Sequence, residues 1–364
     1  MNKKLRVAIL FGGKSAEHEI SVISARNIFG AMDQRKYQIL AIGIDKAGRW
    51  FFDKGARHLS ESGPAEVKIA EKHAATAVLP GAAETPLVRL APQRALAAVD
   101  VVFPVLHGPF GEDGTVQGLL RLANVPFVGA GVLGSAVGMD KDVMKRLLRD
   151  ARIPVPKFLV FRRNSADRIS FAAVKRSLGL PLFVKPANMG SSVGISKVSD
   201  PNQFGSAVKE AFRYDSKILI EENISGREIE CSILGNEDPI ASLPGEIVTR
   251  HGFYSYKAKY IDDKGARLVI PAKLPAALVR KIQRMAIETF QVLCCEGMAR
   301  IDFFLRGRQE IYVNEINTIP GFTQISMYPK LWEASGIPYS DLIDRLIQLA
   351  LERFRKEQNL RASI

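Results

Sequence analysis

The chain has 364 residues and a net charge of +13; this length exceeds what a single hydrophobic core usually holds, so two or three domains are expected. Its lysines and arginines are scattered rather than gathered in a block or a known nucleic-acid module, so we expect the charge to attract anionic substrates, and we expect no nucleic-acid partner. The first apolar run, at 7–11, is too short for a signal peptide, and no apolar run is long enough to cross a bilayer. The 3 cysteines make no disulfide framework. These features predict a cytoplasmic protein without a membrane partner.

Strands and helices alternate over the first third of the chain. Strands are predicted at 6–11, 37–44 and 99–106, with a helix from Glu17 to about Met32 between the first two. This βαβ order is typical of a parallel sheet. Residues 54–95 are rich in Ala, Glu, Pro and Gly and contain no motif that indicates a function.

Two further units are predicted after the first. The second has helices at 140–150 and 169–178 and strands at 157–161, 182–185 and 217–222. The third opens with a strand at 228–234 and closes with a helix from Ser340 to about Arg355, whose apolar stripe predicts a buried face. We therefore expect domains at 1–133, 134–222 and 223–364.

A β-hairpin is predicted within the third unit, from strands at 298–305 and 311–318. Closure about Arg308-Gln309 would place Asp302 opposite Glu315. It would also place Arg300 opposite Asn317, and all four side chains would share one face because residues i and i+2 do. Two carboxylates and an amide oxygen suit Mg²⁺, which prefers oxygen ligands. The alternative is a hairpin with a solvated polar end.

A loop of small residues, Lys185–Gly194, follows the predicted strand at 182–185. Glycines let backbone N–H groups approach a phosphate closely, and the lysine supplies a charge for the same anion. The loop also matches the G-x-S-x-G elbow of serine hydrolases, with Ser192 as the nucleophile. That alternative has only His251 downstream as a base and gives Lys185 and the hairpin no role.

Three other segments carry polar chemistry. Residues 12–19 do not form a P-loop, because Ala8 stands where its first glycine would be; a carboxylate at this helix start is either a dipole partner or a holder of an ammonium group. The loop 107–115 follows the strand at 99–106, and ligands bind at such strand ends. The aromatic and basic stretch 253–260 is either a lid over an anionic ligand or an edge strand.

Together and in this order, these motifs resemble the D-alanine–D-alanine ligases of the ATP-grasp superfamily. The resemblance spans nearly the whole chain except 54–95 and the extreme C-terminus, and it is carried by the segments 12–19, 107–114, 139–141, 185–194, 299–302 and 314–323. It implies an α/β fold of three domains, in which an amino-terminal parallel-sheet domain precedes two α+β domains that clamp ATP. It also implies a lid at 249–265.

The resemblance implies a reaction and its cofactors. ATP would phosphorylate one D-alanine, and the amine of a second D-alanine would attack the D-alanyl phosphate, giving the dipeptide used in peptidoglycan synthesis. A homodimer with two Mg²⁺ ions, which Mn²⁺ can replace, is implied as well. By resemblance the metal ligands are Asp302, Glu315 and Asn317, and the ATP contacts are Lys141, Lys185, Glu221, Glu222, Ile224, Glu228 and Lys259. Asn223 is a departure from the family pattern in the segment beside the adenine, where relatives vary, and it bears only on nucleotide affinity.

The resemblance also implies the D-alanine contacts. Glu19 would hold the first ammonium group and join a network with Ser191 and Tyr260. The remaining contacts are Arg300 and the Gly321 N–H at the oxyanion, Ser326 and the Met327 N–H at the second carboxylate, and His107 and Glu112 beside the first subsite. A D-alanine–D-lactate ligase is the alternative within the superfamily. Tyr260 favours the dipeptide product, because depsipeptide-forming relatives lack it.

Overall fold

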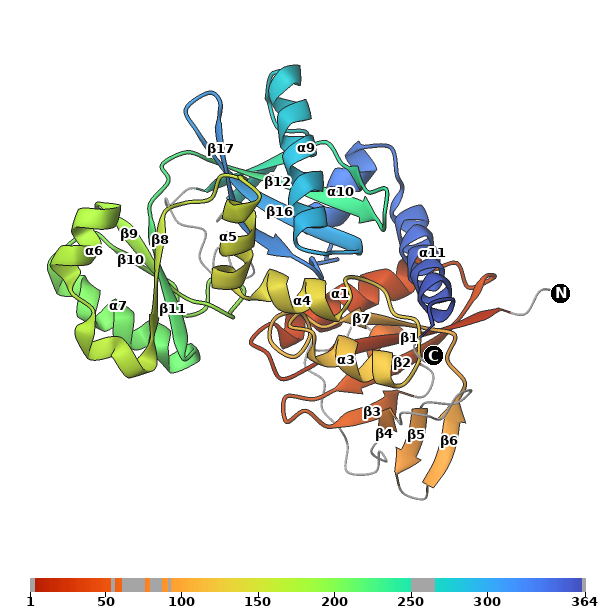
Figure 1. Cartoon of the computed structure of the whole chain (residues 1–364). Coiled ribbons are helices and arrows are strands. Elements are labelled where there is room, and N and C mark those ends of the chain that lie inside the picture. Colours follow the sequence, from red (N-terminus) through yellow and green to blue (C-terminus); the bar gives the residue numbers. More distant parts are fainter. Residues whose placement is uncertain are drawn as a thin grey trace.

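The computed structural model describes residues 4–53, 56–60, 76–78, 87–90, 93–249 and 266–361. Figure 1 shows three larger sheets, each with helices packed against it, and one small sheet. The predicted α/β fold class is therefore confirmed. No helix within these ranges is both long and apolar enough to span a membrane.

The amino-terminal sheet is built around a buried strand, β1. Its order is β3 (Trp50–Asp53), β2 (Tyr37–Ile44), β1 (Leu5–Gly12) and β7 (Val101–Val105). β1 is parallel to both neighbours, and β3 is antiparallel to β2. The predicted parallel sheet is observed, and the same part of the chain contains α1 (His18–Ala31), α2 (Arg57–Ser60), α3 (Thr115–Leu122) and α4 (Val132–Met139).

A small antiparallel sheet lies beside this unit and falls mostly within residues 54–95, the segment in which no motif was found. It contains β4 (Thr76–Val78), β5 (Leu87–Leu90) and β6 (Gln93–Ala97). β5 pairs with both of the other strands.

The central sheet forms a unit that projects from the rest of the molecule (Figure 1). Its antiparallel order is β10 (Ser196–Val198), β9 (Leu182–Pro186), β11 (Lys217–Glu222) and β8 (Phe158–Arg162). The helices of this unit are η1 (Arg163–Arg168), α6 (Phe171–Leu178) and α7 (Pro201–Tyr214). α7 was not predicted, although Pro201 at its first position and Asp200 as its cap are common start signals.

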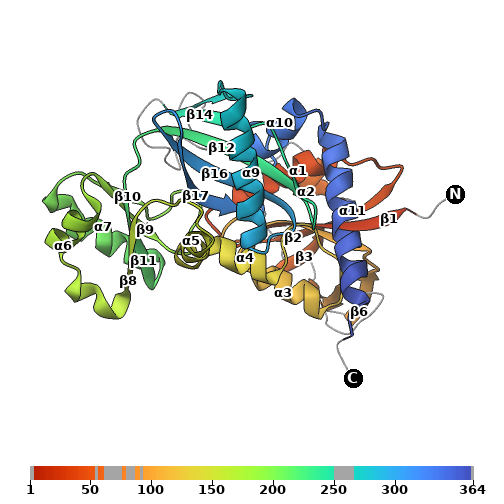
Figure 2. The same cartoon turned by 45° about the horizontal axis from the view of Figure 1, so that its top comes forward.

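The carboxy-terminal sheet carries the predicted hairpin. Its order is β15 (Ala266–Val269), β14 (Gly245–Thr249), β12 (Arg227–Gly235), β16 (Gly297–Arg306) and β17 (Glu310–Asn317), with β13 (Ile240–Ala241) paired to β12. Figure 2 shows α9 (Ala276–Val292) lying across this sheet. Apolar residues of β12, β16, β17 and α9 form one buried core.

Two helices pack with sheets other than those expected from their order in the chain. α5 (Lys141–Asp150) places Met144 and Leu148 in the core of the carboxy-terminal sheet, not in that of the central sheet. α11 (Tyr339–Gln358) packs its apolar stripe into the core of the amino-terminal sheet. The apolar stripe of α11 is buried as predicted. Both helices, however, pack in cores other than those of the domains to which their sequence positions assigned them, because residues far apart in the chain can share one core.

Candidate active site

The hairpin of β16 and β17 has the predicted register at its functional end. Asp302 lies opposite Glu315, and Arg300 lies opposite Asn317. Nearer the turn the register shifts by one residue, because β17 carries a bulge at Asn314. A bulge re-aims a side chain, and here the Asn314 Oδ1 lies 3.4 Å from the Nζ of Lys185. The bulge thus connects the hairpin with the loop that follows β9.

A row of three carboxylates crosses the sheet at this point. Glu230 on β12 lies opposite Asp302 on β16, which in turn lies opposite Glu315 on β17. Side chains directly opposite on neighbouring strands are about 4.5–5.5 Å apart at Cβ, and like charges so placed repel each other. A row of this kind therefore requires a cation.

Arg300 supplies a cation to this row. Its Nε lies 2.7 Å from Asp302 Oδ1 and 2.9 Å from Glu230 Oε2, and its Nη2 lies 2.8 Å from Asp302 Oδ2. Burial disfavours the guanidinium, but the two carboxylates outweigh it and hold the pKa of Arg300 well above its usual value. Arg300 is therefore a permanent positive charge at the cleft.

The oxygens around Asp302 also fit a divalent metal. Within the described ranges no three His, Cys, Asp or Glu side chains enclose a metal by themselves. The donor set is instead two carboxylates, Asp302 and Glu315, with the amide of Asn317, whose Nδ2 donates to Asp302 Oδ2 at 3.0 Å. A hard cation held by few protein oxygens usually shares them with substrate phosphates, so this donor set suits a metal–nucleotide complex.

Two predicted phosphate-binding lysines lie close to the hairpin. The Nζ of Lys141 donates to the Met189 carbonyl oxygen at 2.7 Å and lies 3.8 Å from Glu315 Oε2. The Nζ of Lys185 lies 2.6 Å from Glu221 Oε2. Both ammonium groups and the metal-type donors therefore line one region between the central and carboxy-terminal sheets.

Glu221 lies beneath these lysines and is almost fully buried. Its other oxygen lies 3.2 Å from the Nζ of a further buried lysine, Lys145, which also donates to the Asn314 carbonyl oxygen at 3.1 Å. Burial lowers the pKa of Lys145 to about 8, and Glu221 opposes that shift. Although burial favours its neutral form, the two lysines hold the pKa of Glu221 below its usual range. Glu221 thus anchors two lysines as well as lying on the predicted adenine segment.

Three other predicted nucleotide contacts lie at the end of β11 and on β12. Glu222 Oε1 accepts a hydrogen bond from the Lys157 backbone N–H at 2.7 Å, and Ile224 is buried after β11. Glu228 is half-buried on β12, two residues before Glu230 on the same face. The predicted lid contacts Lys259 and Tyr260, and the lid from residue 250 to 265, lie outside the described residues.

The acid at the helix start is Glu17, not the predicted Glu19. The Ser191 hydroxyl donates to Glu17 Oε1. Glu19 lies in the first turn of α1, where its side chain is 40% exposed and 2.5 Å from the Nζ of Lys46. Glu17, which directly precedes the helix, lines the cleft together with Ser191, whereas Glu19 is not among the residues that line it. The predicted contact between Glu19 and Ser191 is therefore wrong.

Three motifs meet at the Glu17 carboxylate. A Cβ at Gly108 would lie 2.9 Å from its Oε2, and a Cβ at Gly190 would lie 3.1 Å away. Ser191 and Ser192 have φ angles of 50° and 60°, a left-handed conformation that non-glycine residues keep only where surrounding contacts hold it. The bond from Ser191 to Glu17 is one such contact. Glycine at 108 and 190 thus leaves room for the acid between two loops.

Glu112 and His107 lie beside this acid. Glu112 accepts the backbone N–H groups of Gly108 at 2.8 Å and Ile319 at 2.9 Å. Burial, reinforced by the charge of Glu17, raises the pKa of Glu112 to about 8 despite those bonds. A bound cation would favour the ionised form of Glu112, so this pocket suits an ammonium group.

His107 lies on the other side of the cleft and contacts the segment 319–322. Its Nδ1 lies 2.9 Å from the Ile319 carbonyl oxygen, which can only accept, so Nδ1 carries the proton. Its Nε2 lies 3.2 Å from Ser24 Oγ, and that oxygen accepts the Phe322 N–H at 3.1 Å. Burial lowers the pKa of His107, which favours this neutral tautomer. His107 therefore fixes the segment that contains Gly321.

Gly321 and Ser326 close the cleft on the side of α10 (Met327–Ala334). A Cβ at Gly321 would lie 2.8 Å from Ser326 Oγ, so glycine permits the close approach. Ser326 Oγ accepts the Thr323 N–H at 2.9 Å. The first N–H groups of a helix have no intrahelical partner and attract anions. Met327 begins α10 and lines the cleft, together with Glu17, His107, Glu112, Ser191, Glu230, Arg300, Glu315, Asn317, Gly321 and Ser326.

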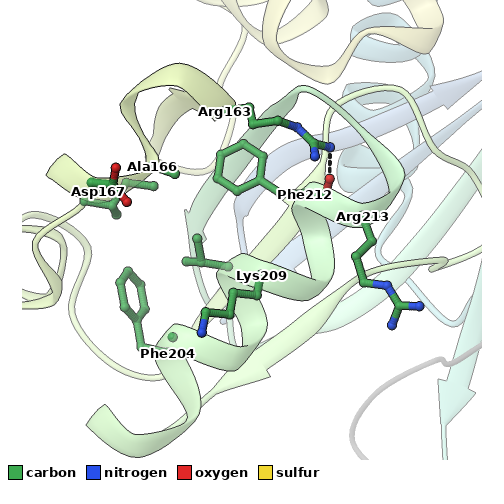
Figure 3. Close-up of a pocket in the computed structure, with 10 residues that line it drawn as sticks. Arg163, Ala166, Asp167, Phe204, Lys209, Phe212 and Arg213 are labelled. Atoms are coloured by element: carbon green, nitrogen blue, oxygen red, sulfur yellow. Dashed lines mark hydrogen bonds between the residues drawn. The ribbon is translucent and has the colours of Figure 1, made fainter.

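A larger cavity lies elsewhere, between η1 and α7 on the central unit. It encloses about 410 Å³, and Figure 3 shows Phe204 and Phe212 among its apolar lining. Its arginines are already engaged: Arg163 donates to the Phe212 and Asp215 carbonyl oxygens, and Arg213 lies 3.1 Å from Glu210. It lacks the clustered carboxylates of the cleft, so we assign the candidate active site to the cleft.

Sequence reasoning missed Glu17, Lys145 and Glu230. The period-2 pattern of β12 places Glu230 on the face of Glu228 and was an available signal for that residue. For Glu17 and Lys145 the sequence contains acids and lysines at several neighbouring positions, and nothing in the pattern distinguishes those that enter the cleft.

The chain is similar to proteins of one family over its whole length. The family described as D-ala D-ala ligase N-terminus matches residues 6–130, and D-ala D-ala ligase C-terminus matches 147–348. The chain is 52% identical to the D-alanine–D-alanine ligase of Oceanobacillus iheyensis, covering 99% of both proteins, and 50% identical to the D-alanine–D-alanine ligase A of Escherichia coli (strain K12), covering 100% of both. Among solved structures, the D-alanine–D-alanine ligase from Coxiella burnetii has a TM-score of 0.86 at 42% identity, over 98% of this chain and 96% of that one. The VanG D-Ala:D-Ser ligase from Enterococcus faecalis also has a TM-score of 0.86, at 35% identity over 96% and 100%.

Proposed function

Because the chain belongs to the D-alanine–D-alanine ligase family, we propose that it joins two D-alanine molecules in an ATP-dependent reaction that passes through a D-alanyl phosphate. The observation that carries the proposal is the cleft itself, where the donor set of Asp302, Glu315 and Asn317 lies beside Arg300, lysines and a buried acid. Phosphoryl transfer needs cations around the phosphates, and a carboxylate–amine ligation needs a holder for an ammonium group.

At the nucleotide end of the cleft, lysines and oxygen donors take different roles. Lys141 and Lys185 bind phosphate oxygens, and Glu221 keeps Lys185 in place. Asp302, Glu315 and Asn317 hold the divalent metal, which we propose is Mg²⁺ as two ions, replaceable by Mn²⁺. When bound, the metal neutralises charge on the transferring phosphoryl group.

At the D-alanine end of the cleft, the acid that faces the substrate is Glu17 in place of Glu19. Glu17 takes the role predicted for Glu19 and holds the first ammonium group, with Glu112 ionising beside it. Arg300 and the Gly321 N–H face the developing oxyanion, where donors aimed in advance lower the barrier most. Ser326 and the Met327 N–H hold the second carboxylate at the start of α10. We also propose a contribution from Tyr260 and Lys259, a cytoplasmic location and a homodimer, all supported by family resemblance.

The serine hydrolase alternative fits the cleft poorly. Ser191, the residue before the alternative nucleophile Ser192, donates its hydroxyl hydrogen to the Glu17 carboxylate. This loop is therefore bonded to an acid, whereas a serine hydrolase would place a histidine beside its serine. His251 is the only histidine after Ser192 in the sequence, and the hairpin acids would have no role. The D-alanine–D-lactate ligase alternative is less favoured, because the most similar relatives described above form the dipeptide by name.

Product chromatography tests the proposed function. The purified protein with ATP, Mg²⁺ and D-alanine should give D-alanyl-D-alanine, with one ADP and one phosphate per dipeptide, and L-alanine should give no product. D-lactate and D-serine added in competition should give minor products. A depsipeptide as the main product, or phosphate release that does not depend on D-alanine, would contradict the proposal.

A further inference from the structure

Arg300 lies between two acids, Asp302 and Glu230, and contacts them differently. Its Nε–H donates to Asp302 Oδ1 at 2.7 Å and lies 2.9 Å from Glu230 Oε2, and its Nη2 donates to Asp302 Oδ2 at 2.8 Å. The side chains of Glu230 and Asp302 are 7% and 14% exposed. The guanidinium therefore has two neighbouring anionic partners in a largely dry site.

The contacts of Arg300 conflict with metal binding. Both oxygens of Asp302 already accept from donors: Oδ1 from Nε, and Oδ2 from Nη2 and from Asn317 Nδ2. A carboxylate oxygen has about two lone-pair positions, and both positions of Oδ2 are occupied, so a metal that binds Oδ2, or both oxygens of Asp302, must displace a donor. A buried guanidinium that lost its only acid would be strongly destabilised, so the exchange requires a second acid within reach.

Glu230 is held where that second acid is needed. The pairing of β12 with β16 places it directly opposite Asp302, and Arg300 is two residues from Asp302 on the same face. The neighbouring residues Ile229 and Phe303 are buried in the core on the other side, so the register cannot slip without exposing them. Glu230 thus accepts the guanidinium after only a small side-chain rotation.

Building on the proposed function, we propose that Glu230 is a positioning residue that receives Arg300 when the divalent metal takes Asp302. Arg300 and the metal compete for one carboxylate, and Glu230 relieves the competition. It also keeps the guanidinium in the cleft, beside the place where negative charge develops. Glu230 itself touches neither the metal nor the reacting atoms.

Metal binding, rather than turnover, is the sharpest test. Mn²⁺ is titrated into the protein at saturating ADP, and free Mn²⁺ is measured by electron paramagnetic resonance against a control of ADP alone. Glu230→Gln should raise the apparent Mn²⁺ dissociation constant about tenfold, the effect of losing one charge-assisted contact, because Arg300 then stays on Asp302. In an Arg300→Met background the same Glu230→Gln change should alter the constant by less than about twofold, because no competitor remains.

The variants keep the outcomes distinguishable. Glu246→Gln is the matched control, since it removes an acid that pairs with Arg227 at 2.7 and 2.8 Å on the same sheet but outside the cleft, and it should leave Mn²⁺ binding unchanged. Equal weakening by Glu230→Gln in both backgrounds would mean that Glu230 acts on the metal directly, by ligation or by its charge, and would overturn the proposal, as would no weakening in the native background. Asp302→Asn separates the two levels: if it leaves Mn²⁺ binding intact, the metal assignment itself has failed.

Discussion

An Asp302→Asn substitution is expected to lower turnover by at least about a hundredfold, comparable to the loss of one strong electrostatic contact in an active site. The change removes an anionic oxygen from the proposed metal site and keeps the shape of the side chain. It also removes the carboxylate that Arg300 and Asn317 contact. Initial rates of phosphate release at saturating ATP and D-alanine measure the effect.

The same hairpin offers a control for this prediction. Glu310 lies at the turn end, exposed and bonded to Arg306 and Tyr312, so Glu310→Gln should leave turnover within about twofold, as expected for a surface pair. Circular dichroism and thermal melting establish that both variants are folded. Near-normal turnover in a folded Asp302→Asn protein would remove the metal assignment.

A Glu17→Gln substitution is expected to lower kcat/KM for D-alanine by roughly ten- to 150-fold, which corresponds to about 1.5–3 kcal/mol for a hydrogen bond to a charged group. Glutamine keeps a hydrogen-bonding oxygen near Ser191 but removes the charge that faces the ammonium group. The KM for D-alanine should rise more than the KM for ATP. Steady-state kinetics with each substrate varied in turn distinguish the two effects.

Glu19→Gln is the matched control, because Glu19 is two residues away and pairs with Lys46 at the surface. It should change kcat/KM by less than about twofold, since exposed ion pairs contribute little. A large loss in Glu19→Gln together with a mild Glu17→Gln would restore the original sequence prediction and remove Glu17 from the site.

The hairpin shows which features of the site could be predicted from sequence. The pairings of Asp302 with Glu315 and of Arg300 with Asn317 are confirmed, because strand alternation and a short turn constrain register strongly. The bulge at Asn314 was not predicted. Its Asn314 contacts Lys185 on β9 and Lys145 on α5, which lie far away in the sequence, so no local pattern contains these contacts.

The helix start shows why other parts could not be predicted. Two acids lie in the segment 12–19, and which of them enters the cleft depends on where α1 begins. The helix begins at His18, so Glu17 precedes it with φ −99° and ψ 18°, while Glu19 belongs to the first turn. Boundaries uncertain by one or two residues are ordinary in sequence reasoning, and here one residue decides which carboxylate faces the substrate.

The packing of α11 is a further limit of sequence reasoning. Its apolar stripe predicts burial but not the partner, and the partner is a sheet more than 200 residues earlier in the chain. Arg353 on α11 also donates to the Phe127 carbonyl oxygen at 2.8 Å and to that of Gly129. The carboxy-terminal helix therefore joins the first and last parts of the chain, and both contribute walls to the cleft.

Transfer of labelled oxygen tests the proposed reaction most directly. D-alanine whose carboxylate carries oxygen-18 is incubated with ATP and the protein, and the phosphate and dipeptide are analysed by mass spectrometry. If the carboxylate attacks the γ-phosphorus of ATP and the second amine then breaks the acyl C–O bond, each phosphate released should carry one labelled oxygen, and the new peptide carbonyl should keep the other. Dipeptide accompanied by unlabelled phosphate, or labelled D-alanine consumed without dipeptide, would contradict ligation through D-alanyl phosphate.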